Sequence, residues 1–354
     1  MALTQVPASM QEPTAQYTGF KNRIINGDMR IDQRRAGASV TPTADGTYTI
    51  DRYETRISQS SKISIQQSTT APAGFTNSML VTSLAATTVG SSDYFAICQS
   101  IEGLNLSDFG WGTANAQTIT LSFWVRSSLT GTFGGSISNG SNRNYPFTYT
   151  INSANTWEKE TITIAGDTSG TWLTTNGKGL QLSLSLGSGS TFNGTAGAWG
   201  SAGFFSATGA TNLVSTNGAT FFITGVQLEK GTTATSFDFR SIGQELALCQ
   251  RYFWKSYSTD VAIGTINSAG PIASIANAAL SVYFPVYFPV EMRAAPTITF
   301  YNNTTGATGT WRDGGGTDRT MSSATPSTRL VSVSNFSTAA NSTINGHLTA
   351  SIEL

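Results

Sequence analysis

Short runs of alternating apolar and polar residues, separated by Gly and Asn turns, recur through most of this sequence. A period of two is that of half-buried β-strands, because successive side chains in a strand point to opposite faces of a sheet. In residues 118–126 the apolar side chains fall on one face, and the other face is polar apart from Trp124. The same alternation returns at 180–186 and 222–228. The pattern predicts an all-β protein with antiparallel sandwich strands.

One segment departs from this period. Ile242, Leu246, Cys249 and Phe253 are spaced by four, three and four residues, which places them on one stripe of a helix. Ser241 is a suitable N-cap for it. Because strand patterns lie on both sides, we expect this helix to join two domains. The expected organisation is a polar leader at 1–20, a first β domain at 21–240, a linking helix at 241–255 and a smaller C-terminal β-sandwich at 256–354.

The composition narrows the classes of partner. Charged residues make up 11% of the chain, against roughly a quarter in ordinary soluble proteins, and 20 basic residues balance 20 acidic ones. No basic patch or long apolar run is present, so we expect no nucleic-acid partner and no membrane insertion. The first residues lack a secretion signal, which predicts synthesis in a cytoplasm. Cys98 and Cys249 exclude a disulfide framework, while a single bridge between them stays open.

Catalytic residue types are scarce. His347 is the only histidine, and no motif for a nucleophile, a nucleotide or zinc accompanies it. The densest acidic group could serve a sugar-cleaving site, but arginines lie among its members, and surface ion pairs are the simpler interpretation. The sequence therefore predicts no enzyme and no cofactor. The acidic residues are Asp28, Asp32, Asp51 and Glu54, and the arginines are Arg30, Arg34, Arg35, Arg52 and Arg56.

Two loops carry the residue types that sugar binding needs, namely flat aromatic rings among short polar side chains. The first runs from Gly187 to Thr211 and is long enough to be functional. Its candidates are Trp199, Phe192, Phe204 and Phe205, with Trp199 the leading one. The alternative is that these aromatic side chains close the end of the sandwich. The adjacent Phe204 and Phe205 are expected to point opposite ways.

The second loop runs from Asn302 to Arg319, around three consecutive glycines. Exposed Trp, Arg and Asp side chains on such a loop would suit hydroxylated or charged glycans, and solvated loop decoration is the alternative. The candidates here are Trp311, Arg312, Asp313, Asp318 and Arg319.

Several ordered blocks of the chain resemble bacteriophage tail-fibre and related virion proteins. They are NRIINGDMRIDQRRAG at 22–37, TYTIDRY at 47–53, TLSFWVRSSLTGTF at 120–133, NTWEKETITIAGDTSGTW at 155–172 and FFITGVQLEKGTTATSFDFRSIGQELALCQRYF at 221–253. FPVEMRAAPTITF at 288–300 and the closing GHLTASIEL resemble the C-terminal domain of such fibres. The NGD turn and the ITGVQLE strand are also similar to jelly-roll carbohydrate-binding modules.

This resemblance implies that the first domain is a jelly roll and that the protein is a homotrimer. It also implies attachment to a virion, for example to its tail, through the N-terminus. The implied function is a short tail fibre that binds host surface polysaccharide. In many such modules acidic residues on the last strand help to hold a structural calcium ion, whereas Thr224 and Gly225 stand here, which argues against that site. A head fibre, decoration or collar protein, and a polysaccharide-degrading tailspike, remain alternatives. The host, the glycan and the docking partner are not identified.

Overall fold

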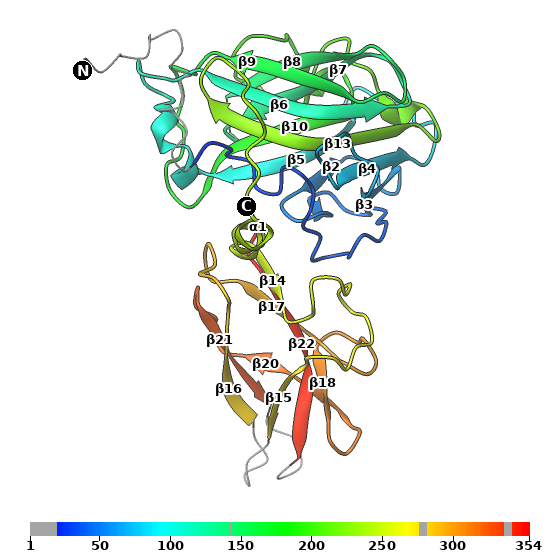
Figure 1. The fold of residues 1–354 in the computed structure, drawn as a ribbon, viewed down its shortest axis with the longest axis vertical. Coiled ribbons are helices and arrows are strands. Elements are labelled where there is room, and N and C mark those ends of the chain that lie inside the picture. Colours follow the sequence, from blue (N-terminus) through cyan, green and yellow to red (C-terminus); the bar gives the residue numbers. More distant parts are fainter. Residues whose placement is uncertain (1–19, 142, 276–281, 336–341) are drawn as a thin grey trace, which may run out of the picture.

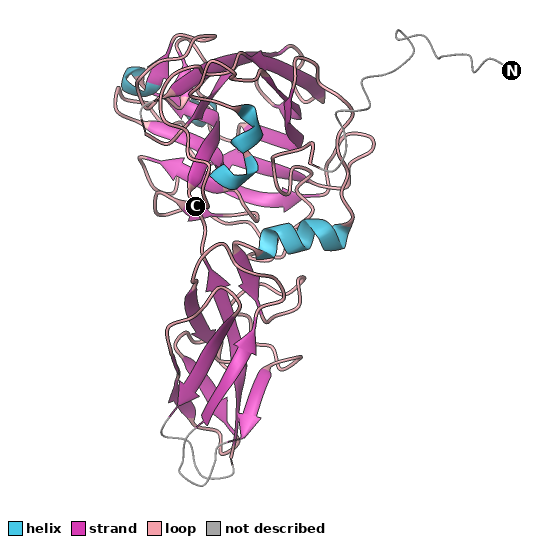
Figure 2. Cartoon of the chain, turned by 90° about the vertical axis from the view of Figure 1, so that its left-hand side faces the viewer, coloured by secondary structure: helices cyan, strands magenta, loops and turns pink. Residues whose placement is uncertain are grey.

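The computed structural model describes residues 20–141, 143–275, 282–335 and 342–354. Two β-rich units follow one another, and the helix α1 (Ile242–Gln250) lies between them (Figures 1 and 2). The expected leader at 1–20 falls outside the described residues except for Phe20. Within the described ranges, no helix has the length and apolar character needed to cross a membrane.

The first unit is a sandwich of two antiparallel sheets. Its six-stranded sheet has the order β1 (Thr47–Tyr48), β2 (Glu54–Ile57), β5 (Tyr94–Glu102), β10 (Lys178–Ser188), β7 (Gly131–Ser138) and β8 (Asn144–Ile151). Its five-stranded sheet has the order β3 (Ile63–Ser68), β4 (Ser78–Ser83), β13 (Thr220–Lys230), β6 (Ile119–Ser127) and β9 (Glu158–Ile164). Both sheets therefore pair strands that are far apart in the sequence.

The alternation of residue types decides which face of each strand enters the core. Ile119, Leu121, Phe123 and Val125 of β6 are fully buried between the two sheets, as the period of two predicts. The leucines of β10 enter the same core from the other sheet. The intervening residues of β10, which include Gln181 and Ser183, consequently line the outer face of the six-stranded sheet.

The second unit is a smaller sandwich with its own core. One sheet is built around β22 (Thr343–Ser351) and the other has the order β16 (Val282–Tyr287), β21 (Leu330–Asn335) and β20 (Ser322–Ser323). The strands beside β22 are β14 (Phe253–Lys255), β15 (Ile272–Ile275), β17 (Thr297–Tyr301) and β18 (Thr310–Asp313), with β19 (Asp318–Thr320) paired to β18. The predicted fold class is thus confirmed: all-β, a jelly-roll sandwich, a short helix and a smaller C-terminal sandwich.

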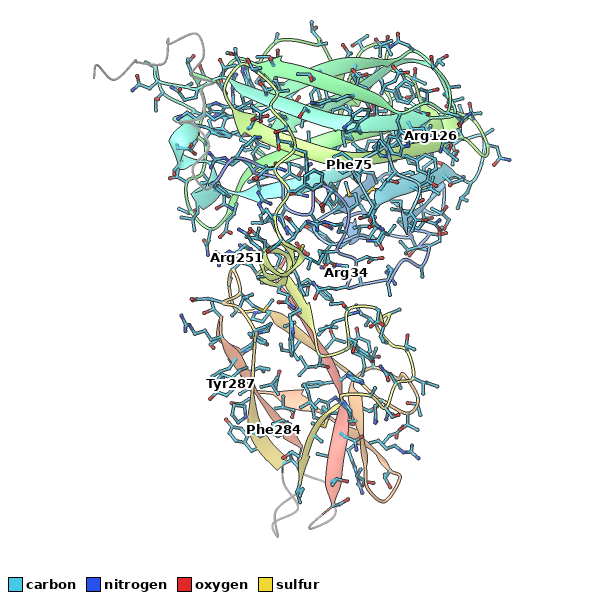
Figure 3. The ribbon with its side chains drawn as sticks, in the orientation of Figure 1. Arg34, Phe75, Arg126, Arg251, Phe284 and Tyr287 are labelled. Carbon is cyan, nitrogen blue, oxygen red and sulfur yellow. The ribbon has the colours of Figure 1, made fainter. Side chains whose placement is uncertain are left out.

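Ion pairs join the two units. Near the C-terminus, Glu353 forms ion pairs with Arg34 and Arg52 of the first unit, and its Oε1 lies 2.6 Å from Arg34 Nη2. Arg251, just after α1, forms a bidentate pair with Glu102 at 2.6 and 2.9 Å. Figure 3 shows Arg34 and Arg251 at the boundary between the units.

Two sequence expectations at this junction are wrong. Asp28, Asp32, Asp51 and Glu54 are not surface residues, because the junction and neighbouring strands bury them to 7% exposure or less. The helix begins as predicted, since Ser241 Oγ accepts from Gln244 N. Ile242, however, is 54% exposed and does not belong to the buried stripe. Cys98 and Cys249 are both buried and free, so they form no bridge.

Candidate functional site

A narrow groove of about 160 Å³ lies on the outer face of the six-stranded sheet. Strands β2, β7, β8 and β10 supply its floor and rim, and residues 202–205 form a wall. We call this feature the groove. The residues lining it are Arg56, Ser138, Gly140, Ser141, Arg143, Asn144, Lys178, Gln181, Ser183, Ala202, Gly203, Phe204 and Phe205.

The floor of the groove is polar. Gln181 Nε2 donates to Ser183 Oγ at 3.3 Å, and Lys178 Nζ donates to Gln181 Oε1 at 2.9 Å. Asn144 at the rim uses its amide nitrogen to donate to Phe204 O, while its Oδ1 is buried without a hydrogen-bond partner. The groove thus holds side-chain amides and hydroxyls, which can donate to and accept from the hydroxyls of a sugar.

Aromatic side chains border the same groove. Phe205 stacks on Tyr94 with ring centroids 5.0 Å apart, and Phe192 packs edge-on against Tyr94 at the same distance. Phe204 instead lies over Gly194, so the two adjacent phenylalanines have different neighbours. Ser136 Oγ donates to Phe204 O at 2.7 Å and fixes this wall to β7. All three phenylalanines remain half-exposed.

Cationic side chains complete the rim. Arg56 pairs with Asp45 at 3.1 Å, beside Phe205, whose ring centroid lies 5.7 Å from the guanidinium carbon. Arg143 holds Asp167 through two bonds of 2.6 and 2.7 Å, and this hydrogen bonding raises the pKa of Arg143.

The structure places Trp199, the leading candidate of the first loop, outside the groove. Its indole ring packs against Trp111, Trp172 and Tyr145, with centroid distances of 5.1 to 5.5 Å. Its Nε1 donates to Ala165 O at 2.8 Å. The ring is half-buried at one end of the sandwich, which matches the alternative of an aromatic plug.

The expectation that Trp311 is exposed on the second loop is wrong, because its side chain is fully buried in strand β18. Its Nε1 donates to His347 O at 2.8 Å, and it packs directly over Gly346. The four charged candidates of this loop form ion pairs with one another. Arg312 pairs with Asp318 and Arg319 pairs with Asp313, both at 2.7 Å. This hairpin is therefore a structural part of the second unit.

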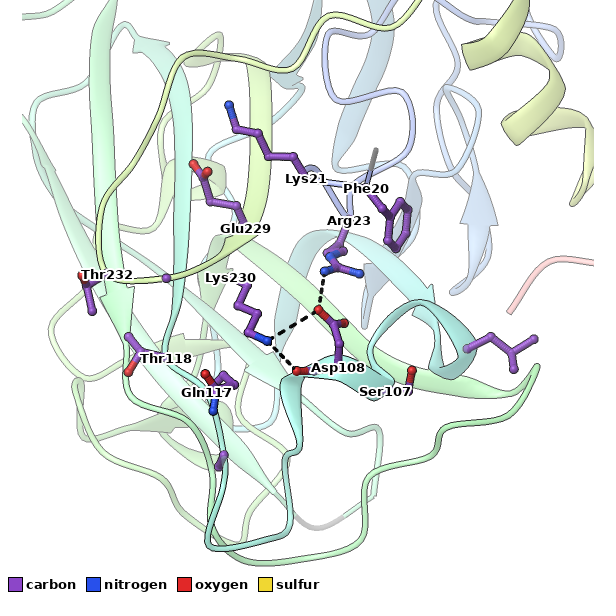
Figure 4. Close-up of a pocket in the computed structure, with 13 residues that line it drawn as sticks. Phe20, Lys21, Arg23, Ser107, Asp108, Gln117, Thr118, Glu229, Lys230 and Thr232 are labelled. Carbon is purple, nitrogen blue, oxygen red and sulfur yellow. Dashed lines mark hydrogen bonds and ion pairs between the residues drawn. The ribbon is translucent and has the colours of Figure 1, made fainter. Parts of the chain in front are cut away.

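A larger hollow of about 790 Å³ lies at the edge of the first unit, where the described chain begins (Figure 4). Its charged groups bond to one another: Arg23 donates to Asp108 at 2.8 Å, and Lys230 donates to the Asp108 carbonyl at 3.0 Å. Glu229 accepts from Thr235 and Gln227 of its own strand and loop.

The described residues that line the groove include no histidine, cysteine or carboxylate that could serve in catalysis or bind a metal. His347 is buried, stacked on Tyr257 at 3.8 Å, and burial lowers its pKa. Among the described residues, no three His, Cys, Asp or Glu side chains gather closely enough to hold a metal ion.

Sequence reasoning found Phe192, Phe204 and Phe205 near the groove but missed its floor. Gln181 and Ser183 were seen only as the polar half of a strand pattern, and Lys178 was not singled out. The available signal was that every outward residue between the leucines of 180–186 carries a hydroxyl or an amide. Knowing that a groove opens on this face required the arrangement of the neighbouring strands, because Gln181 and Ser183 themselves are only 5% and 1% exposed.

No family model and no curated protein matches this chain. Distant likenesses to solved structures cover between half and two thirds of the chain. The enzymatically active domain of tailspike protein 4 from bacteriophage CBA120 is 12% identical with a TM-score of 0.32, over 59% of this chain and 21% of that chain. A family 61 carbohydrate-binding module, solved with β-1,4-galactotriose, is 11% identical with a TM-score of 0.30, over 60% and 99%. The family 11 module from Clostridium thermocellum, solved with a β-1,3-1,4-mixed-linked tetrasaccharide, is 11% identical with a TM-score of 0.29. The match covers 55% of this chain and 97% of that chain. Likenesses this remote do not establish a function.

Proposed function

We propose that this chain is a carbohydrate-binding protein that holds bacterial surface glycans in the groove of its six-stranded sheet. The observation that carries the proposal is the meeting of a hydroxyl and amide floor, at Gln181 and Ser183, with the half-exposed rings of Phe204 and Phe205. Short polar groups bond sugar hydroxyls, and a flat ring packs against the C–H side of a sugar. The aromatic side chain that contributes most in this account is Phe205.

The test is retention of the purified chain on a panel of immobilised bacterial surface polysaccharides. Phe205→Ala should weaken retention about tenfold or more, because losing a packed aromatic ring of this kind costs on the order of 1.4 kcal/mol or more, which is tenfold in affinity. Phe239→Ala is the matched control, since Phe239 is 55% exposed and does not line the groove. Equal retention by both variants would contradict the proposed site, and no retention by the intact chain would contradict carbohydrate binding.

We further propose that the protein is a non-enzymatic appendage of a bacteriophage particle, a short tail fibre, as the sequence blocks at 22–37 and 221–253 suggest. In a trimer, three weak sites would bind a repeating glycan with increased effective affinity. Immunogold labelling of particles checks the location, and sedimentation equilibrium checks the trimer. Label confined to the head would favour a head fibre or decoration protein.

The same panel checks catalysis and metals. A non-enzymatic protein should leave the chain length of every retained polysaccharide unchanged during prolonged incubation. Retention should also survive EDTA, since no cofactor is expected. Shortening of a polysaccharide would instead support the tailspike alternative, and loss of retention in EDTA would indicate a calcium requirement.

A further inference from the structure

The charges around the groove are unbalanced. Three of the residues that line it are cationic, Arg56, Arg143 and Lys178, and none of its described lining residues is acidic. The whole chain is neutral, with 20 basic and 20 acidic residues, so this local excess does not follow from composition.

Two of the three cations already have carboxylate partners. Arg56 pairs with Asp45, and Arg143 is held by both oxygens of Asp167. Lys178 differs, because its Nζ donates to the neutral amide oxygen of Gln181 at 2.9 Å and forms no ion pair within the described part of the chain. Its aliphatic stem lies against Gly140, where an added Cβ would come within 3.0 Å of Lys178 Cδ.

Two carboxylates are candidates for a counter-charge: Glu102, the cross-strand partner of Lys178, which is held by Arg251, and Glu54, which is the cross-strand partner of Cys98. Glu54 is 6% exposed and does not line the groove. Burial raises the pKa of this carboxyl, although Lys178 and Arg56 act in the opposite direction. The ammonium of Lys178 is therefore the charge at the groove that has no direct carboxylate contact.

We propose that the groove selects an acidic glycan and that Lys178 binds a sugar carboxylate, such as that of a uronic acid. This inference rests on the proposed carbohydrate binding and names the class of glycan that the groove takes. A carboxylate placed on Lys178 would form a charge-assisted hydrogen bond, while Gln181 and Ser183 bond the ring hydroxyls. Because Arg56 and Arg143 are already paired with carboxylates, Lys178 supplies the charge that would attract an acidic chain at low ionic strength.

The test compares the same polymer with and without its charge. The probes are polygalacturonate, alginate and hyaluronan, each offered intact and after reduction of its carboxyl groups to primary alcohols. The intact chain should bind at least one acidic polymer, and carboxyl reduction should weaken that binding about tenfold or more. Lys178→Gln should cause a loss of similar size, Lys178→Arg should retain most binding, and binding should decrease as salt rises. Lys159→Gln, which removes an exposed lysine on strand β9, is the matched control and should bind as the unmodified chain does.

The outcomes separate this inference from the function on which it rests. Equal binding of the reduced and intact polymers, or an equal loss in Lys178→Gln and Lys159→Gln, overturns the acidic selectivity while carbohydrate binding stands. Binding to neutral polysaccharides alone has the same meaning. Absence of binding to every acidic and neutral polymer by a correctly folded chain overturns both.

Discussion

At the scale of single residues, burial changes the titration of the carboxyl groups near the junction of the two units. Asp51 is 1% exposed and accepts a hydrogen bond of 2.6 Å from Gln33 Nε2. Burial raises the pKa of Asp51 from 3.8 to about 7, although Arg34 acts in the opposite direction. The folded protein therefore keeps a proton on Asp51 at pH values where the unfolded chain has lost it.

This raised pKa predicts a specific pH dependence. The stabilisation that Asp51 gains by holding its proton is fully present below pH 3.8 and is lost as the pH rises toward about 7. Asp51→Asn stays neutral, so its stability should increase relative to the unmodified chain across that interval and then remain level. Denaturant midpoints measured for both proteins over the interval test this.

Asp93→Asn provides the contrast for that experiment. The hydrogen bond from Ser58 lowers the pKa of the Asp93 carboxyl, so its contribution is present at neutral pH and lost on acidification. The Asp93→Asn variant should therefore approach the unmodified chain as the pH falls. Parallel curves for Asp51→Asn and the unmodified chain would contradict the proposed titration of Asp51.

These residues also show where sequence reasoning stops. Of the four acidic residues singled out between 28 and 54, only Asp28, with Arg30, and Asp51, with Arg34, form the expected ion pairs within the described chain, and all four were wrongly placed at the surface. Their burial depends on partners such as Glu353 and α1, which come from the other end of the chain. Spacing within one segment cannot reveal a contact of that kind.

At the scale of elements, the alternation of apolar and polar residues predicted the buried face of a long strand well and that of a short strand poorly. The nine residues of β6 carry enough period to assign both faces. The four residues of β18 do not, and three glycines beside them made Trp311 look like part of a loop. The signal that was missed lies on another strand, where Gly346 leaves room for the indole ring.

This packing makes Gly346→Ala a sharp test of the second unit. A Cβ at Gly346 would lie 2.1 Å from Trp311 Cδ1, so either the ring or the strand must move. We expect the substitution to destabilise the protein by about 1–3 kcal/mol. Thermal or denaturant unfolding measures this change.

Gly243→Ala is the matched control in helix α1. Nothing lies within 4 Å of its Cβ position, so the substitution should be neutral or stabilise by up to about 1 kcal/mol. If Gly346→Ala were as well tolerated as Gly243→Ala, the buried position of Trp311 would be contradicted.

At the scale of the whole molecule, the contacts of Glu353 fix the second unit to the first. Its carboxylate meets Arg34 and Arg52, whose side chains are 12% and 1% exposed. Arg52 also lies 3.5 Å from the ring centroid of Tyr252, and Arg34 lies 3.8 Å from that of Phe253. Removing Glu353 would leave Arg52 without a carboxylate partner at a buried interface and Arg34 with only the more distant Asp51, at 3.8 Å.

Glu353→Ala should therefore destabilise the protein by about 3–5 kcal/mol, as is usual when one partner of a buried ion pair is removed. It should also increase the spread of distances between the units in small-angle scattering. Glu291→Ala removes an exposed partner of Arg329 and should change neither property appreciably. A Glu353→Ala variant that behaves like Glu291→Ala would show that this contact does not hold the units together.

The central claim is that the groove on the six-stranded sheet binds a glycan, and a crystal structure of the intact chain with a retained oligosaccharide tests it most directly. We expect sugar rings over Gln181 and Ser183, with one ring against Phe205 and an acidic group next to Lys178. Sugar bound instead in the hollow beside Arg23 and Lys230, or on the second unit, with the groove empty, would contradict the claim.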